Sequence, residues 1–143
     1  MEELQLSLNK VLADTFGMYY KAHAYHWNVI GANFAQYHEF FNKIYKELWD
    51  AVDNIAEHVK AIDGVPPNKL SDLKDMMSIT EVNVISALDM INDLNITNNL
   101  VLVSLMRAYQ LADDADELGL ANFIQDRIDI HQKHGWMLKA TLK

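Results

Sequence analysis

Cysteine is absent from this chain of 143 residues, so disulfide bonds and thiolate metal ligands are excluded. Proline occurs twice and glycine five times, which leaves few helix-breaking positions and favours long helices. No apolar run approaches the roughly 20 residues that a membrane-spanning helix needs. The lack of cysteine, together with a beginning that is acidic and amphipathic and unlike a secretory signal, predicts a cytoplasmic location.

Positive charge is also scarce. Twelve Lys and Arg residues stand against 20 Asp and Glu residues, which gives a formal net charge of −8. Phosphate binding needs clustered Lys and Arg, so this balance argues against a general polyanion-binding protein. An acidic surface attracts cations instead. Half of the residues are hydrophobic, and the length is enough to bury a core, so we expect one folded domain over residues 1–143.

Apolar residues recur at steps of three and four, which predicts an all-α protein with long helices over about 3–29, 34–62, 83–112 and 116–141. Gly31 ends the first helix, and Asn33 is an expected N-cap of the second. The predicted core positions of the first helix are Leu4, Leu8, Val11, Thr15, Met18 and Ala22. Those of the second are Phe41, Ile44, Leu48, Val52, Ile55, Val59 and Ile62.

The sequence Asp63-Gly64-Val65-Pro66-Pro67 is the clearest stop signal in the chain. After it, SDLKDMM and TEVNVISALDMI read as short helices, and Ser78 to Glu81 resembles a capping box. The Asn-rich stretch 92–99 is expected to interrupt the third long helix. No strand pattern or internal repeat is present. The long link between the second and third helices indicates a four-helix bundle with one crossover connection.

Two histidines and two carboxylates form the most informative pattern. His26 and His38 stand twelve residues apart, and Asp53 and Glu57 follow on the same predicted helix as His38. Imidazole with carboxylate suits iron and neighbouring divalent metals. On one helix, His38 and Asp53 would be separated by about 22 Å of rise, so one ion cannot bridge them within a chain. Either they belong to different sites, or two antiparallel copies of the helix form a symmetric dimer with two shared sites.

These residues resemble the Dps-type mini-ferritins, a branch of the ferritin-like superfamily. The resemblance covers nearly the whole chain. It is carried by His26-Trp27-Asn28-Val29, Gly31, Asn33-Phe34, His38-Glu39, Asp53, Glu57 and the C-terminal His134-Gly135-Trp136-Met137-Leu138. It implies a ferritin-like four-helix bundle, with a short helix in the long connection, assembled as a hollow twelve-subunit shell. Such shells oxidise Fe(II), preferentially with hydrogen peroxide, and store ferric mineral that protects against oxidative stress.

The resemblance also implies where the iron chemistry occurs. His26 and His38 of one subunit, with Asp53 and Glu57 of another, would form a ferroxidase site at a two-fold interface, in agreement with the distance argument. The family commonly has a carboxylate four residues after the second His, where this chain has Asn42. An amide is a weaker, neutral iron ligand, so we expect an altered second iron position and altered rather than absent activity.

Several further residues have a functional and a structural interpretation. Trp27 would wall the site and intercept a stray oxidant, or pack at a helix end. Glu39 would help nucleate mineral, or stand as an exposed carboxylate. An acidic group would line an iron-entry pore, or complement a helix dipole; it comprises Asp113, Asp114, Asp116 and Glu117. Structural or surface roles are expected for the remaining histidines, which are His23, His58, His131 and His134. Core or interface positions, rather than roles as redox relays, are expected for Tyr19, Tyr20, Tyr25, Tyr37 and Tyr45.

Other metal chemistries find little support. The di-iron centres of classical ferritins use Glu-x-x-His, and this sequence contains none. The segment from His38 to Asn42 lacks the second histidine of a zinc-protease motif. Two alternative functions stay open: a nucleoid-binding structural protein with impaired iron chemistry, and a passive assembly that binds zinc or another divalent metal.

DNA binding in this family often depends on a flexible tail rich in Lys and Arg. Here Lys10 is the only basic residue before the first helix is under way, and Lys143 ends the sequence. We therefore expect weak or absent DNA binding at physiological salt, with Mg²⁺-bridged association and a place at the nucleoid left open.

Overall fold

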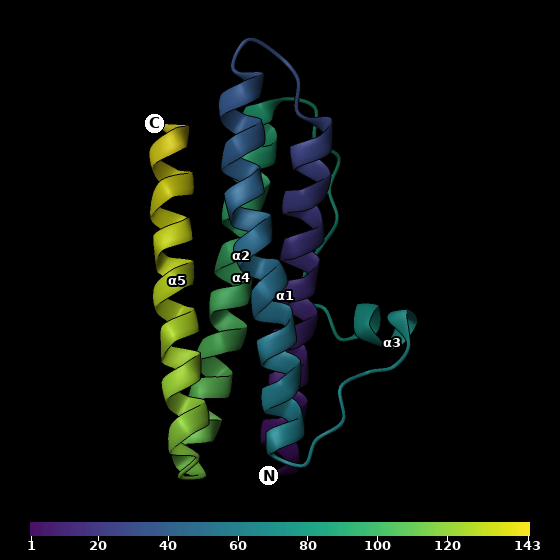
Figure 1. The fold of residues 1–143 in the computed structure, drawn as a ribbon, viewed down its shortest axis with the longest axis vertical. Coiled ribbons are helices and arrows are strands. Elements are labelled where there is room, and N and C mark those ends of the chain that lie inside the picture. Colours follow the sequence, from purple (N-terminus) through teal and green to yellow (C-terminus); the bar gives the residue numbers. More distant parts are fainter.

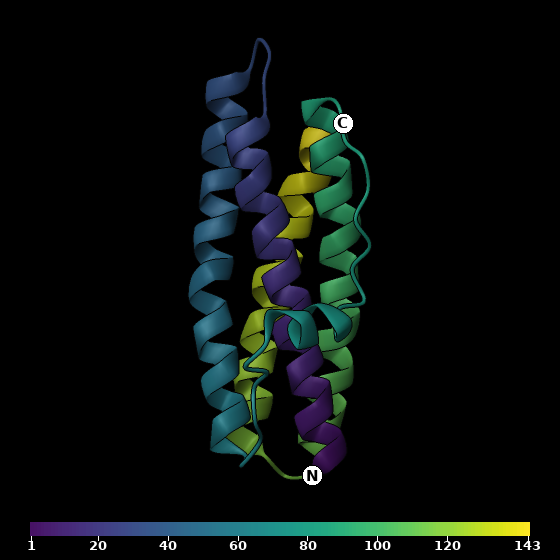
Figure 2. The same cartoon turned by 90° about the vertical axis from the view of Figure 1, so that its right-hand side faces the viewer.

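The computed structural model describes all 143 residues and is all-helical. Its elements are α1 (Glu2–Asn28), α2 (Phe34–Ala61), α3 (Leu70–Asp75), α4 (Ala87–Asp114) and α5 (Leu118–Leu142). The four long helices run side by side, with α1 and α5 pointing one way and α2 and α4 the other (Figure 1). The crossover between α2 and α4 climbs along the flank of the bundle and carries α3, which lies across the middle of α1 (Figure 2). The predicted bundle with one crossover is confirmed.

The predicted apolar stripes form the core. Leu4, Leu8, Val11, Thr15, Met18 and Ala22 of α1 are all buried. On α2 the predicted positions are buried except Val52, which is half-buried. Burial of these stripes is the main source of stability for the helices, because most helical stability in proteins comes from packing of an apolar face rather than from intrinsic propensity.

The connection differs from its prediction in three respects. Within SDLKDMM, only residues 71–75 are helical, as part of α3. The segment TEVNVISALDMI does not form a separate helix, since its first part has no regular secondary structure and its last part begins α4 at Ala87. The capping box lies at Ser86 and Asp89, whose side chains and backbone N–H groups bond reciprocally. The predicted box at Ser78 is wrong, because Ser78 donates from its backbone N–H and its hydroxyl to buried Asp14 on α1.

The Asn-rich stretch 92–99 does not interrupt α4, contrary to the prediction. Its polar side chains are used in tertiary contacts instead. Asp93 and Thr97 are buried and bind the ammonium of Lys21, and Asn98 is fully buried and bonds to His131. Because these side chains are bonded across the bundle, they do not compete for the backbone of their own helix.

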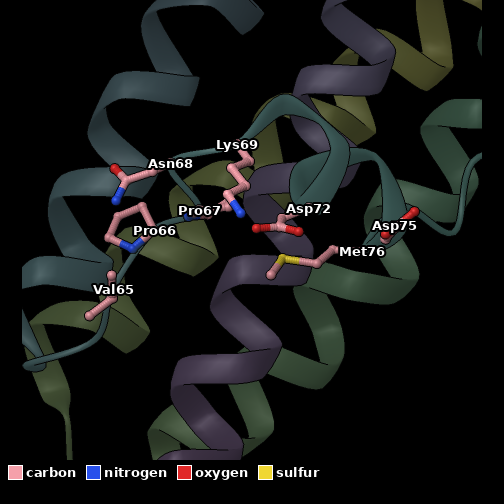
Figure 3. A pocket seen from close by; sticks show the side chains of 8 residues that line it. All are labelled: Val65, Pro66, Pro67, Asn68, Lys69, Asp72, Asp75 and Met76. Carbon is pink, nitrogen blue, oxygen red and sulfur yellow. The ribbon is translucent and has the colours of Figure 1, made fainter.

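Side chains between Val65 and Met76 line a shallow hollow between the end of α2 and α3 (Figure 3). It contains Lys69, Asp72 and Asp75, without a histidine, and none of the predicted site residues contributes to it. The hollow therefore lies within the crossover and does not form part of the candidate site.

Candidate metal centre

His26 and His38 meet at the end of the bundle where α1 ends and α2 begins. The loop between them turns through Gly31, whose φ of +117° is disfavoured for residues that carry a side chain. The two imidazole rings stack, with centroids 3.7 Å apart and planes inclined by 17°. His26 Nδ1 lies 2.8 Å from the carbonyl oxygen of His38, and His38 Nδ1 lies 2.7 Å from the carbonyl oxygen of His26.

These reciprocal bonds determine which ring nitrogen carries the proton. A carbonyl oxygen can only accept, so each Nδ1 must be the donor. In a neutral imidazole with the proton on Nδ1, the lone pair lies on Nε2. Metal-binding histidines in proteins usually donate their other ring N–H to a carbonyl or carboxylate in this way, which fixes the tautomer and the ring orientation. The pair is therefore prepared to offer two neutral nitrogen ligands.

Asp53 and Glu57 lie one turn apart on the exposed surface of α2. The rise along α2 between His38 and Asp53 is about 22 Å, as expected from the sequence. Within one chain, no three His, Asp or Glu side chains are close enough together to hold a metal ion. The structure thus brings the two histidines together and leaves the two carboxylates apart from them, so a centre built from all four needs a second chain.

Aromatic side chains surround the histidine pair on the α1–α2 face. Tyr45 stacks on His23 with ring centroids 3.8 Å apart, and its centroid lies 5.2 Å from that of His26. The Trp27 ring centroid is 4.2 Å from that of His23. Trp27 and Trp49 are both 56% exposed. Large exposed aromatic surface of this kind marks an interaction site more often than a free surface.

His23 belongs to this site, although a structural or surface role was expected for it. It stands three residues before His26, on the same face of α1, and Tyr19 bonds to its Nδ1 at 2.8 Å. Burial and the neighbouring His26 lower the pKa of His23, which keeps its ring neutral near pH 7. The spacing of three within a helix was the available signal.

The remaining predicted residues lie where helix periodicity puts them. Asn42 is half-buried one turn after His38, and Glu39 is exposed. The acidic group occupies the turn between α4 and α5, at the other end of the bundle from the histidine pair (Figure 1). Asp113, Asp114 and Asp116 are exposed and Glu117 is half-buried. The pore and nucleation roles of these residues stay predictions.

A polar cluster that sequence reasoning missed links α2, α4 and α5 inside the bundle. Arg127 binds Glu47 in a bidentate pair, and His134 Nε2 lies 2.9 Å from Glu47 Oε1. His131 is fully buried between Arg127 and Asn98. Burial and the charge of Arg127 hold the pKa of His131 well below its usual range, so its ring is neutral. This part of the interior is therefore occupied by an ion pair whose carboxylate is Glu47. A carboxylate-rich iron centre would need several acidic ligands there.

Because of Glu47, the free energy of unfolding should vary with pH in the acid range. Burial alone would raise its pKa, but hydrogen bonds from His134 and Arg127 and the charge of Arg127 outweigh burial and hold it at about 2, against 4.5 ordinarily. A lowered pKa stabilises the fold above pH 4.5, and that contribution is lost as pH falls toward 2.

We expect Glu47→Gln to reduce the pH slope of the unfolding free energy in this window by up to about 1.4 kcal/mol per pH unit. Urea unfolding measured at several pH values checks this. The exposed Glu39→Gln is the control, and an unchanged slope in Glu47→Gln would contradict the assignment.

Comparison with known proteins agrees with this architecture. Residues 5–143 match the ferritin family described as a ferritin-like domain. The DNA protection during starvation protein of Brevibacillus brevis is 36% identical over 95% of this chain and 92% of its own length. The chain is a Dps-type member of the ferritin-like family.

Solved structures of Dps proteins superpose on it closely. The Dps protein from Bacillus brevis gives a TM-score of 0.94 at 32% identity, covering 99% of this chain and 96% of its own. The Dps protein from Vibrio cholerae O1, described as one of the ferritin-like diiron-carboxylate proteins, also gives 0.94, at 26% identity over 99% and 90% of the two chains. These comparisons confirm the predicted family and the ferritin-like fold of this Dps-type chain. None of its helices is both long and apolar enough to cross a bilayer.

Proposed function

We propose that this Dps-type chain is a ferroxidase that oxidises Fe(II) with hydrogen peroxide, or with O₂, at sites shared between two subunits. The observation that carries the proposal is the reciprocally bonded pair His26 and His38, which leaves two Nε2 lone pairs free beside an exposed aromatic surface. Asp53 and Glu57 of a second subunit would supply the anionic ligands. Ferric product would be stored inside a closed shell, which the family resemblance predicts to contain twelve subunits.

An antiparallel pairing of two α2 helices would form the shared site. If His38 of one subunit faces Asp53 of another, the two-fold axis passes halfway between these positions, beside Tyr45. Trp49 and Trp27 then fall within the contact, which explains large aromatic side chains that are 56% exposed in the single chain. Each such dimer holds two identical sites.

The donor set suits the chemistry. Imidazole nitrogens and carboxylate oxygens bind Fe(II), and two anionic ligands favour the Fe(III) product further. Peroxide accepts two electrons, and two ferrous ions supply both, so hydroxide forms without free hydroxyl radical. Glu57 is the residue we expect to bridge the two ions, and Trp27 to wall the site.

The proposal is tested by the ratio of Fe(II) oxidised to peroxide consumed. Anaerobic assembled protein is saturated with Fe(II), so that both iron positions of each site are filled, and is titrated with hydrogen peroxide while iron oxidation and hydroxyl radical are measured together. We expect two Fe(II) oxidised per peroxide and little trapped radical. Oxidation no faster than in a protein-free solution would contradict a ferroxidase. Retention of metal without oxidation would support a passive metal-binding assembly.

Asn42 should weaken the second iron position, because it offers a neutral amide where an anion would bind more strongly. We expect Asn42→Asp to tighten binding of the second Fe(II) and to raise the amount of iron oxidised in the first fast phase from about one toward two ions per site. Stopped-flow oxidation at increasing Fe(II) loading measures this. The exposed Asn99→Asp on α4, a helix that contributes no candidate ligand, is the matched control. An identical loading curve for Asn42→Asp and the unsubstituted protein would show that Asn42 does not limit the second ion.

The alternative of a DNA-binding structural protein is disfavoured by charge. A chain of net charge −8 gives a strongly acidic assembly, and DNA affinity depends on neutralising phosphates with Lys and Arg. We expect no gel shift of duplex DNA at physiological salt without divalent cations. A shift that weakens steeply as salt rises would instead support DNA binding.

A further inference from the structure

Tyr19 and His23 form a hydrogen-bonded pair that the proposed ferroxidase chemistry leaves unused. Both lie on α1 one turn apart, and the Tyr19 hydroxyl is 2.8 Å from His23 Nδ1. With the His23 proton on Nε2, the phenol donates to Nδ1. Burial is the main cause that raises the pKa of Tyr19, so the phenol keeps its proton in the resting protein. A tyrosine can lose an electron readily only when a nearby base takes this proton.

A continuous series of aromatic ring contacts joins this pair to the candidate iron site. The Tyr45 ring is parallel to that of His23 within 5°, at a centroid distance of 3.8 Å, and lies 5.2 Å from His26. His26 stacks in turn on His38. On the other side of the pair, the Trp49 centroid is 5.1 Å from that of Tyr19. Every step from the phenol to the iron-binding histidines is therefore a ring-to-ring contact.

We propose that Tyr19, with His23 as its proton acceptor, supplies the second electron to peroxide when a site holds a single Fe(II). This inference rests on the proposed ferroxidase function and revises, for Tyr19, the core or interface position expected from spacing alone. Sites with one iron are expected, because Asn42 offers a neutral amide at the second iron position. One Fe(II) supplies one electron, and peroxide needs two.

The reaction balances without a further reagent. Fe(II), the Tyr19 phenol, neutral His23 and hydrogen peroxide give Fe(III), a neutral tyrosyl radical, protonated His23 and two hydroxide ions. Iron and the phenol each lose one electron, and the O–O bond breaks as peroxide gains both. The phenolic proton moves along the existing hydrogen bond to Nδ1. The hydroxyl radical that a lone Fe(II) would otherwise release is not formed.

Freeze-quench electron paramagnetic resonance tests this on the assembled protein. Shells carrying one Fe(II) per site are mixed with hydrogen peroxide, and Fe(II) consumption is followed in parallel. We expect a tyrosyl signal whose hyperfine pattern collapses when the protein contains ring-deuterated tyrosine, which separates it from a Trp27 radical. Tyr19→Phe should abolish the signal and release trappable hydroxyl radical. His23→Phe, which keeps a ring to stack on Tyr45 but lacks a nitrogen base, should abolish it too.

Tyr109→Phe is the matched control, because Tyr109 is half-buried on α4 and its hydroxyl bonds to Gln125 rather than to a histidine. It should leave the signal unchanged. Fe(II) oxidation without a tyrosyl signal, or a signal that persists in Tyr19→Phe, would overturn this inference while leaving the ferroxidase function intact. Absence of Fe(II) oxidation in the unsubstituted shell would overturn the proposed function and this inference with it.

Discussion

Replacing His26 with Ala is expected to lower the rate of peroxide-dependent Fe(II) oxidation by about 100-fold or more. Removing a residue that only orients a metal ligand already costs up to about 100-fold, and His26 is a proposed ligand itself. The substitution removes one Nε2 ligand. It also removes the ring that donates to the carbonyl of His38 and stacks on the second ligand, so His38 keeps only its bond to the backbone carbonyl of residue 26 to orient it. Stopped-flow absorbance of ferric product, on samples shown to be assembled, measures the effect.

Asp53→Ala should cause a loss of the same order, because it removes an anionic ligand from the opposite side of the shared site. Asp129→Ala on α5 is the matched control, since this carboxylate is exposed and belongs to no candidate site. It should oxidise Fe(II) at the rate of the unsubstituted protein. Unchanged rates in assembled His26→Ala and Asp53→Ala would place the chemistry elsewhere.

Asp93→Leu is expected to lower the free energy of unfolding by about 3–5 kcal/mol, the usual cost of removing one partner from a buried ion pair. Asp93 lies 3.0 Å from the Lys21 ammonium and accepts a hydrogen bond from Tyr25. The Lys21 and Asp93 side chains are only 10% and 7% exposed. Burial and the hydrogen bond to Asp93 both raise the pKa of Tyr25, so its phenol stays a donor. Leucine would leave Lys21 charged, buried and unpaired.

The double variant Lys21→Met with Asp93→Leu separates this explanation from simple loss of packing. It removes both charges, so it should be more stable than Asp93→Leu alone, because the unpaired ammonium is gone. Urea unfolding followed by circular dichroism gives the free energy of unfolding of both variants and of the unsubstituted protein. A cost below about 1 kcal/mol for Asp93→Leu would indicate that the pair is solvated, as surface pairs are.

The helices could be predicted where a long stripe of apolar residues determines them. The bounds of α1 and α2 differ from prediction by one residue, because their core positions repeat without a break over some seven turns. The crossover could not be predicted as well. Ser78 and Ser86 both have an acidic residue three positions later, and only the buried carboxylate of Asp14, 64 residues before Ser78, decides between them.

The candidate site, like the fold, could be predicted only in part. His26, His38, Asp53 and Glu57 were identified from spacing and family resemblance. The reciprocal bonds of the histidine pair depend on how the loop through Gly31 closes, which spacing does not give. The Glu47 cluster was missed because its partners Arg127 and His134 are 80 and 87 residues away in the sequence, although adjacent in the bundle.

The most direct test of a shared site is the activity of shells assembled from equal amounts of His26→Ala and Asp53→Ala chains, each nearly inactive alone. In an interface containing one of each, one of the two sites receives its histidines and its carboxylates from unsubstituted positions. Random assembly makes half of the interfaces mixed, so about one quarter of the sites are intact. We predict about one quarter of the unsubstituted rate of Fe(II) oxidation. A mixed shell as inactive as its two parents would contradict a ferroxidase site shared between subunits.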